Sequence, residues 1–388
     1  MKHAARSCVA AACLLCFLGG CAFTPMSQSR AGPGERVGAP SGQASATTSA
    51  NTTSAGTPVE SDTHSQPAPP QPLQLPKTVV LSVEPWTDFP GETGLVVRTN
   101  AYRLFMTVSD RRLVRDLPAF CEQALESYRT SLAELPPPPL KLDTYLMDSR
   151  AQWETLTRIV TRERADDYLQ IRRGGFAYRG SGYFWDIGFA DTLSITAHEG
   201  WHQYTQRTFK NRLPSWLEEG VATYHEGLRL SDRRGRTATP RLLAWSNTER
   251  FDRLREAVGA GRLLPLSEVV RLTPGDLLSR SEDAALDWYA QVWGAVHFLK
   301  EADDGRYAGA LSSILEDAAA GQLWRTVGRR YGRSAARAAI RAHGAGAVLK
   351  TYLETDDAEL DRAYVRFVSA VVAPGMRERI LEGESPLG

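Results

Sequence analysis

The pattern of apolar positions first predicts strands. After about residue 77, short runs of β-branched and aromatic residues alternate with polar ones, which is typical of strands that bury one face. Two glycine-containing runs between 174 and 184 predict a hairpin or an edge strand. We therefore expect a small mixed sheet in the first part of the folded region. The other predicted strands cover 78–83, 94–99, 102–108 and 140–146.

Helical spacing of apolar residues appears between these strands. One helix is predicted over 111–135, where Asp110 would cap the first turn and the prolines at 136–139 would end the helix. A second helix is predicted over 151–161. Helices therefore interrupt the predicted strands.

From Asp191 onward the pattern is helical almost throughout, with loops expected at 230–240 and 274–282. Strands followed by helices indicate an α+β fold. The expected domain covers 78–388. Its parts are a small mixed N-terminal sheet with helices over 78–190, a mainly α-helical lobe over 191–375, and a short tail.

The chain begins with a segment that predicts export. Lys2 and Arg6 precede an apolar stretch at 8–18, which is too short to span a membrane and is typical of a signal peptide. The following Leu-Gly-Gly-Cys resembles a bacterial lipobox, so residues 1–20 are predicted to be the signal and Cys21 to carry the lipid. An ordinary secretory signal is the alternative. We expect an exported protein, lipid-anchored in the cell envelope, on the outer membrane or facing the periplasm if the host is Gram-negative.

Between Cys21 and residue 77 the sequence is mostly Ser, Thr, Gly, Pro, Ala and Gln. Such a composition cannot bury enough apolar surface to offset its ordering entropy. Residues 21–77 are therefore predicted to be the lipidated cysteine followed by a disordered tether.

Charge and cysteine content limit the classes of partner and of fold that the chain can have. The chain has 46 Lys and Arg against 45 Asp and Glu, so no basic excess favours nucleic acid as a partner. Of the five cysteines, only Cys121 lies in the folded region, which excludes an internal disulfide framework. Cys121 lies in an apolar helical pattern and is expected to be a core residue. The oligomeric state has no signature in the sequence.

The strongest chemical signal is the motif HExxH, formed by His198, Glu199 and His202 on a predicted helix. Residues four apart share a helix face, with Cβ atoms about 5–6 Å apart, so both imidazoles can reach one Zn²⁺. Glu199 lies about 100° around the helix. From there it should miss the ion and reach a water held by it, as a general base does.

A third ligand must come from another segment. Two neighbouring glutamates, Glu218 and Glu219, follow His202 by 16 and 17 residues. Ser215 and Glu218 fit the capping-box pattern S-x-x-E, which would turn Glu218 back to the start of its helix. Glu219 is therefore the preferred ligand, and Glu218 remains the alternative.

Four stretches match, in order, the sequence pattern of a known family: DTL at 191–193, HQ at 202–203, LPSWLEEGVA at 213–222 and YAQVWGAVHFL at 289–299. With HExxH, they resemble the gluzincin metallopeptidases, the peptidase MA-like clan that includes thermolysin. The resemblance is nearest to a group of uncharacterised bacterial proteins and covers roughly 102–372. It implies a zincin-type helical lobe with HExxH on the active-site helix, and Zn²⁺ as cofactor. It also implies His198, His202 and Glu219 as ligands and Glu199 as base.

The resemblance also implies a role for Tyr289. Aminopeptidases of this clan place a tyrosine downstream of the glutamate ligand, where its hydroxyl stabilises the oxyanion of the transition state. The alternative is that Tyr289 packs a helix together with Trp288 and Trp293.

The chain departs from the clan at two places. Thr223 stands where thermolysin-like enzymes have an aspartate that orients a zinc histidine. Asp191, Glu226 or a backbone carbonyl could take that role, and the sequence does not decide between them. The exopeptidase motif Gly-x-Met-Glu-Asn of the aminopeptidases is absent from the sequence, which favours an endopeptidase.

Gly174, Gly175 and Phe176 occupy roughly the place of that motif. An edge strand there could bind an extended peptide by strand pairing. A plain hairpin without a binding role is the alternative.

The sequence as a whole predicts a zinc-dependent hydrolase of peptide bonds in the cell envelope, with a peptide or protein as substrate. Two alternatives share most of its features. One is a hydrolase of cell-wall amides, which would use the same ligands. The other is an inactive zinc-fold lipoprotein that acts as a binding or scaffold module.

Overall fold

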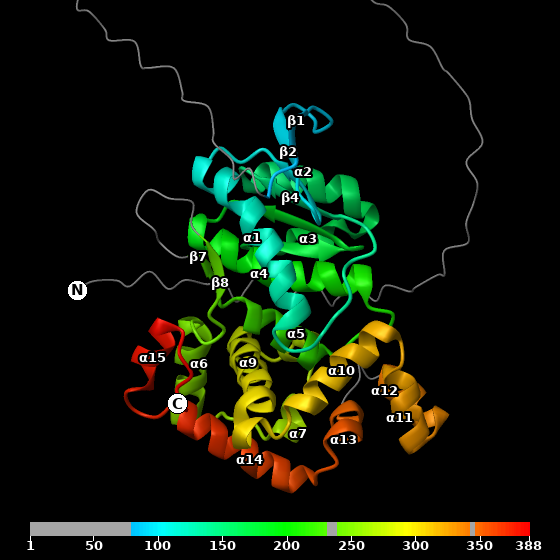
Figure 1. Ribbon diagram of the computed structural model, residues 1–388, viewed down its shortest axis with the longest axis vertical. Helices are drawn as coiled ribbons and strands as arrows, with labels where there is room; N and C mark the ends of the chain where they lie inside the picture. Colours follow the sequence, from blue (N-terminus) through cyan, green and yellow to red (C-terminus); the bar gives the residue numbers. More distant parts are fainter. Residues whose placement is uncertain (1–78, 231–238, 342–345) are drawn as a thin grey trace, which may run out of the picture. The chain divides into compact units, whose positions relative to one another are not determined.

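The computed structural model describes residues 79–230, 239–341 and 346–388. The predicted signal peptide at 1–20, the lipidated Cys21 and the tether at 21–77 lie outside these ranges. A six-stranded sheet is followed by a mainly helical region, which confirms the predicted α+β fold. In Figure 1 the sheet belongs to the blue and green part of the chain and the later helices run from yellow to red.

The sheet is mixed, with the strand order β1-β2-β3-β4-β6-β5. The β3–β4 and β4–β6 pairs are parallel and the others antiparallel. Parallel neighbours need a crossover, which α1 and α2 supply. The elements are β1 (Ser82–Trp86), β2 (Gly94–Arg98), β3 (Tyr102–Met106), α1 (Arg111–Thr130), β4 (Leu142–Met147), α2 (Arg150–Thr161), β5 (Gly175–Tyr178) and β6 (Ser181–Trp185).

Helices cover both faces of the sheet. On one face, Gln203 of α4 (Phe189–Thr208) donates a hydrogen bond to the carbonyl oxygen of Asp143 and lies 3.1 Å from the hydroxyl of Thr144, which ties α4 to β4. On the other face, Trp153 of α2 packs against Phe176, with ring centroids 5.8 Å apart. The sheet thus fixes the position of the helix that carries HExxH.

The helical region packs outward from α4. α4 contacts α5 (Ser215–His225), and α5 contacts α9 (Glu282–Gly305), so α5 lies between these two helices (Figure 1). The remaining helices are α3 (Ala165–Leu169), α6 (Thr248–Gly259), α7 (Leu266–Val269), α8 (Pro274–Leu278), α10 (Ala308–Ala320), α11 (Leu323–Tyr331), α12 (Arg333–Arg341), α13 (Ala347–Leu353), α14 (Asp357–Val371) and α15 (Met376–Glu382). A 3₁₀ turn at Arg162–Arg164 follows α2.

Several predicted boundaries change. Asp110 caps α1 as predicted, but the helix ends at Thr130 instead of 135. A short ribbon of β7 (Leu228–Leu230) and β8 (Pro240–Leu242), each only three residues long, was not predicted. α8 lies where a loop was expected, and it begins with a capping box between Thr273 and Asp276.

α5 is buried on all sides, from Ser215 to His225. A helix without an exposed face lacks the amphipathic pattern that normally reveals it. Its contact with α9 depends on Gly220, where a Cβ atom would lie 2.8 Å from the carbonyl oxygen of Val292. The close approach brings the polar residues of α5 into the interior.

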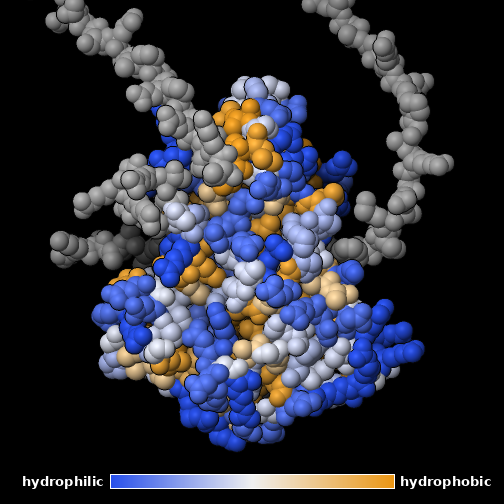
Figure 2. All heavy atoms as spheres, viewed as in Figure 1, coloured by the Kyte–Doolittle hydropathy of each residue, from blue (hydrophilic) through white to orange (hydrophobic). Residues whose placement is uncertain are grey.

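The face drawn in Figure 2 is mostly polar, and apolar side chains gather on it at several places, one of them near β1. There Leu81 and Val83 are 63% and 45% exposed. Among the residues that the structure describes, no helix is both long enough and apolar enough to cross a membrane.

Candidate metal centre

The HExxH residues lie in the middle of α4, where the helix is buried against α1 and α5. Gly200, between them, lets α1 approach, since a Cβ atom there would lie 2.5 Å from the hydroxyl of Tyr128. That hydroxyl donates a hydrogen bond to the carbonyl oxygen of Ala197 (2.6 Å). Tight packing therefore holds this turn of the helix in one position.

His198 and His202 point at each other as their spacing predicts. Their Nε2 atoms are 3.3 Å apart, and both side chains are almost fully buried. With Glu199 they form a group whose ligand atoms all lie within 4.8 Å of one another. This buried group could hold a metal ion.

Glu219 extends this group from α5. Its Oε2 atom lies 3.4 Å from Nε2 of His198 and 3.6 Å from Nε2 of His202. The side chain is fully buried, and neither carboxylate oxygen has a hydrogen-bond partner. A buried carboxylate is normally hydrogen-bonded, paired with a charge or bound to a cation. The three atoms therefore form a compact triangle suited to a shared positive charge.

Glu218, the other candidate of that pair, turns to the opposite nitrogen of His202. Nδ1 of His202 donates to Oε1 of Glu218 (3.0 Å), and the hydroxyl of Thr205 donates to the same oxygen (2.7 Å). The predicted capping box is wrong, because Pro214 occupies the N-cap position and the Ser215 hydroxyl has no hydrogen-bond partner. Glu218 instead fixes the orientation of His202.

Glu226 does the same for His198. Nδ1 of His198 donates to Oε1 of Glu226 (2.8 Å). Of the three partners that the sequence left open, Asp191 instead pairs with Arg173. In the neutral imidazole a donating Nδ1 leaves a lone pair on Nε2, and in both histidines Nε2 faces the triangle, as metal ligation requires.

Glu226 is held by residues that sequence reasoning missed. Arg250 of α6 donates from Nε to Oε2 (3.1 Å) and from Nη2 to Oε1 (2.9 Å). Asn247 donates from Nδ2 to Oε2 (2.6 Å). Asn247 had a visible signal as a helix cap, but Arg250 is one arginine among many and had none.

The carboxylates dominate the electrostatics of the site. Burial alone would lower the pKa of His198 and His202, but Glu219 with Glu226 and Glu218 raises both. Burial would raise the pKa of Glu219, but the two histidines lower it to about 2. The carboxylate of Glu219 is therefore charged at neutral pH and attracts a cation.

Glu199 has a different environment. Its Oε2 atom accepts a hydrogen bond from the backbone N–H of Ala177 in β5 (3.0 Å). Burial, only partly offset by His202 and His198, raises its pKa. A raised pKa brings the carboxyl group closer to the range in which it can both accept and release a proton near neutral pH.

β5 is an edge strand, next to Glu199. The Ala177 carbonyl accepts from Nε2 of Gln206 (3.3 Å), so both outward backbone groups of Ala177 bind α4. By strand alternation the backbone of Gly175 faces the same edge, while Gly174 bonds inward to β6. The side chain of Phe176 is fully buried among aromatic rings. Substrate binding at this edge stays a prediction and would involve backbone groups.

Tyr289 of α9 is fully buried. The guanidinium of Arg250 lies 5.3 Å from the centre of its ring, and Trp288 packs beside it. The role of its hydroxyl in catalysis stays a prediction.

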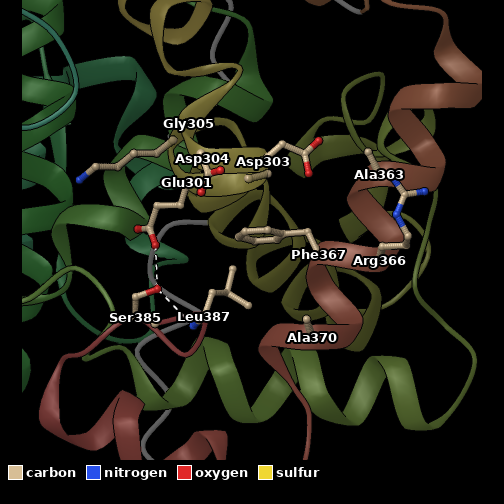
Figure 3. Close-up of a pocket in the computed structure, with 13 residues that line it drawn as sticks. Glu301, Asp303, Asp304, Gly305, Ala363, Arg366, Phe367, Ala370, Ser385 and Leu387 are labelled. Carbon is tan, nitrogen blue, oxygen red and sulfur yellow. Dashed lines mark hydrogen bonds between the residues drawn. The ribbon is translucent and has the colours of Figure 1, made fainter.

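Access to the site is narrow. His198, Glu199 and Glu219 have no exposed surface, and His202 is 4% exposed. A cavity of about 630 Å³ lies elsewhere, at the break in α9 near Asp303 (Figure 3). That cavity is separate from the metal centre.

Residues 192–320 match the model of a protein family of unknown function, DUF1570. The matched stretch runs from α4 to the end of α10 and includes the HExxH residues, both glutamates of α5 and the first turn of α6. No curated protein and no solved structure was found that matches the chain.

Proposed function

We propose that this chain is a zinc-dependent hydrolase of peptide bonds, with His198, His202 and Glu219 as ligands and Glu199 as general base. The observation that carries the proposal is the triangle formed by the two Nε2 atoms and Oε2 of Glu219. Its sides are 3.3, 3.4 and 3.6 Å. Ligands at 2.0–2.1 Å from a tetrahedral Zn²⁺ lie about 3.3 Å apart.

The charge of the site supports a cation. Glu199, Glu218, Glu219 and Glu226 are buried together, and the guanidinium of Arg250 pairs with Glu226. Uncompensated buried charge is strongly unfavourable. Two imidazoles with one carboxylate suit Zn²⁺ better than Mg²⁺ or Ca²⁺, which prefer oxygen ligands.

Zinc in this site would make a water molecule more acidic and polarise the carbonyl of the scissile bond. Glu199 would accept the proton of the attacking water and deliver it to the nitrogen of the leaving amine. Glu226 and Glu218 would hold the two imidazoles in the tautomer that presents Nε2. We also propose that Tyr289 donates a hydrogen bond to the oxyanion.

The substrate side of the proposal rests on β5. Its outer edge lies beside the general base, because Ala177 binds Glu199 directly. An extended peptide that pairs with the outward groups of Gly175 would pass close to Glu199. We propose a peptide or protein substrate in the cell envelope, reached by an enzyme anchored through a lipid on Cys21.

A second candidate is a zinc-holding protein without hydrolytic activity. The burial of the ligands favours it, since a catalytic site must leave an open position for water. The intact Glu199 argues against it, because a purely structural site has no use for a base at this position.

The test is Glu199→Gln, with Glu134→Gln, at an exposed position, as the matched control. Cleavage of a fluorogenic peptide library and bound zinc are measured on each protein. We expect Glu199→Gln to lose at least about 100-fold in activity with zinc retained, since a general base contributes about 10²–10⁴. Equal activity of Glu199→Gln and the unmodified protein would contradict the assignment. Absence of cleavage by the unmodified, zinc-loaded protein would favour the second candidate.

A further inference from the structure

The first turn of α6 converges on Glu226, the partner of His198. Asn247 is the N-cap of α6, and its Oδ1 accepts from the backbone N–H of Arg250 (3.2 Å). The amide nitrogen of the same side chain donates to Glu226. One asparagine therefore caps the helix and binds the carboxylate, while Arg250, one turn later, binds both carboxylate oxygens.

The ion pair of Arg250 and Glu226 is almost completely buried. The two residues are 2% and 3% exposed, whereas Arg253 of the same helix forms its ion pairs with Asp283 and Asp287 nearer the surface. A buried ion pair adds little net stability, because desolvation offsets the attraction. Its lasting effect is geometric, since a two-pronged arginine allows the carboxylate only one orientation.

The orientation matters because Oε1 of Glu226 receives both Nη2 of Arg250 and Nδ1 of His198. A rotation of the carboxylate would break the bond to His198. The imidazole would then be free to turn, and its Nε2 atom would leave the triangle with Glu219.

Arg250 itself has a second contact. The ring of Tyr289 lies 5.3 Å from its guanidinium carbon, a distance at which a cation and an aromatic face attract. The segment that enters α6 is fixed as well, because Nε1 of Trp245 donates to Glu301, which lines the cavity in Figure 3. Arg250 thus contacts both the ring of Tyr289 and the carboxylate of Glu226.

We propose that Arg250 and Asn247 are positioning residues for the metal centre, which hold His198 through Glu226, and that the ring of Tyr289 supports Arg250. This inference rests on the proposed zinc site and goes beyond it. It assigns α6 a role in positioning the metal ligands, and it assigns the ring of Tyr289 a role separate from that of its hydroxyl.

The experiment measures the zinc dissociation constant by chelator competition, and the melting temperature of the zinc-free protein, for the unmodified chain and its variants. Arg250→Lys keeps the charge and loses the two-pronged contact. Asn247→Ser keeps a helix cap and loses the amide donor. Arg253→Lys is the matched control on the same helix. We expect the first two variants to bind zinc about 10–100-fold more weakly and the control to be unchanged.

A double-mutant comparison tests the route through Glu226. If Arg250 acts only through this carboxylate, Glu226→Gln and the double variant Glu226→Gln/Arg250→Lys bind zinc equally. Additive losses would overturn that route. Tyr289→Phe should leave zinc affinity unchanged, whereas Tyr289→Leu should weaken it.

The outcomes separate this inference from the proposed function. Unmodified protein that fails to bind zinc contradicts both. Unmodified protein that binds zinc, with Asn247→Ser and Arg250→Lys equally tight, contradicts the inference alone. A lower melting temperature with unchanged zinc affinity would show that the two residues only stabilise the fold, and it would also overturn the inference.

Discussion

At the scale of single residues, the neighbouring glutamates Glu218 and Glu219 of α5 have different roles in the candidate site. Successive residues of a helix point about 100° apart. Glu219 therefore faces the Nε2 atoms of both histidines, while Glu218 reaches Nδ1 of His202 from the side. One turn of helix thus supplies a candidate ligand and the group that orients another ligand.

His225, at the end of α5, illustrates the cost of a buried titratable group. Its Nδ1 donates to the carbonyl oxygen of Val221 (2.8 Å), and its Nε2 accepts from the hydroxyl of Ser131 (3.2 Å). Burial lowers its pKa to about 4. The folded state therefore favours the neutral form of the His225 ring over the charged form.

A pH-dependent loss of stability follows. Above about pH 6.5, His225 is neutral in both states and contributes no pH dependence. As the pH falls from 6.5 towards 4, the unfolded chain takes up a proton that the folded chain does not, so the folded state loses stability. Between pH 7.5 and 4.5, we expect the free energy of unfolding of His225→Gln, which lacks this titration, to fall by about 2–3 kcal/mol less than that of the unmodified protein. Urea unfolding in excess chelator measures this, and equal losses would contradict the burial of a neutral ring.

At the scale of elements, the site depends on how closely α5 packs on α9. Gly220 is the point of contact, and a methyl group there would lie 2.8 Å from both the Val292 carbonyl oxygen and Cγ2 of Val296. The backbone on one side cannot yield without moving α9. α5 would therefore shift, and Glu219, the residue directly before Gly220, would shift with it.

We expect Gly220→Ala to lower the free energy of unfolding by about 1–3 kcal/mol, as overpacking of an interior does. Gly309 of α10 is the control, because no atom lies within 4 Å of a Cβ there. Gly309→Ala should be neutral or stabilise by up to about 1 kcal/mol, since alanine favours helix. Urea unfolding compares the two variants. Equal effects would show that α5 and α9 are not in close contact.

The sequence predicts elements that bury one face and misses those that do not. The first strand was predicted at 78–83 but is observed at Ser82–Trp86. The other strands and α2 were close to their observed bounds because their apolar residues follow the period of the element. β7 and β8 are too short to show a period. α5 was found only through its glutamates, because a helix buried on all sides has no polar stripe.

In the candidate site, too, some features could be predicted from the sequence and others could not. HExxH is a local pattern, so His198, Glu199 and His202 could be predicted as a group. The contact between Glu226 and Arg250 joins residues 24 positions apart, and its geometry depends on how α6 packs. The role given to Glu218 as part of a capping box failed because Pro214 already occupies the N-cap position.

At the scale of the whole molecule, the sheet and the helical region meet at α4. The sheet supplies Ala177, which binds the proposed base, and the helical region supplies Glu219 and the residues that orient both histidines. The family match at 192–320 covers the helical contributions and leaves out the sheet. The edge of β5 is therefore the part of the site that lies outside the matched stretch.

The most direct test of this account is the zinc content of the purified protein, measured by mass spectrometry of the native chain. The comparison is with Glu219→Ala and Glu218→Ala, which differ by one position on the same helix. The account predicts one zinc per chain in the unmodified protein, none in Glu219→Ala, and one in Glu218→Ala at saturating zinc. Zinc retained by Glu219→Ala, or no zinc in the unmodified protein after reconstitution, would contradict the proposed metal centre.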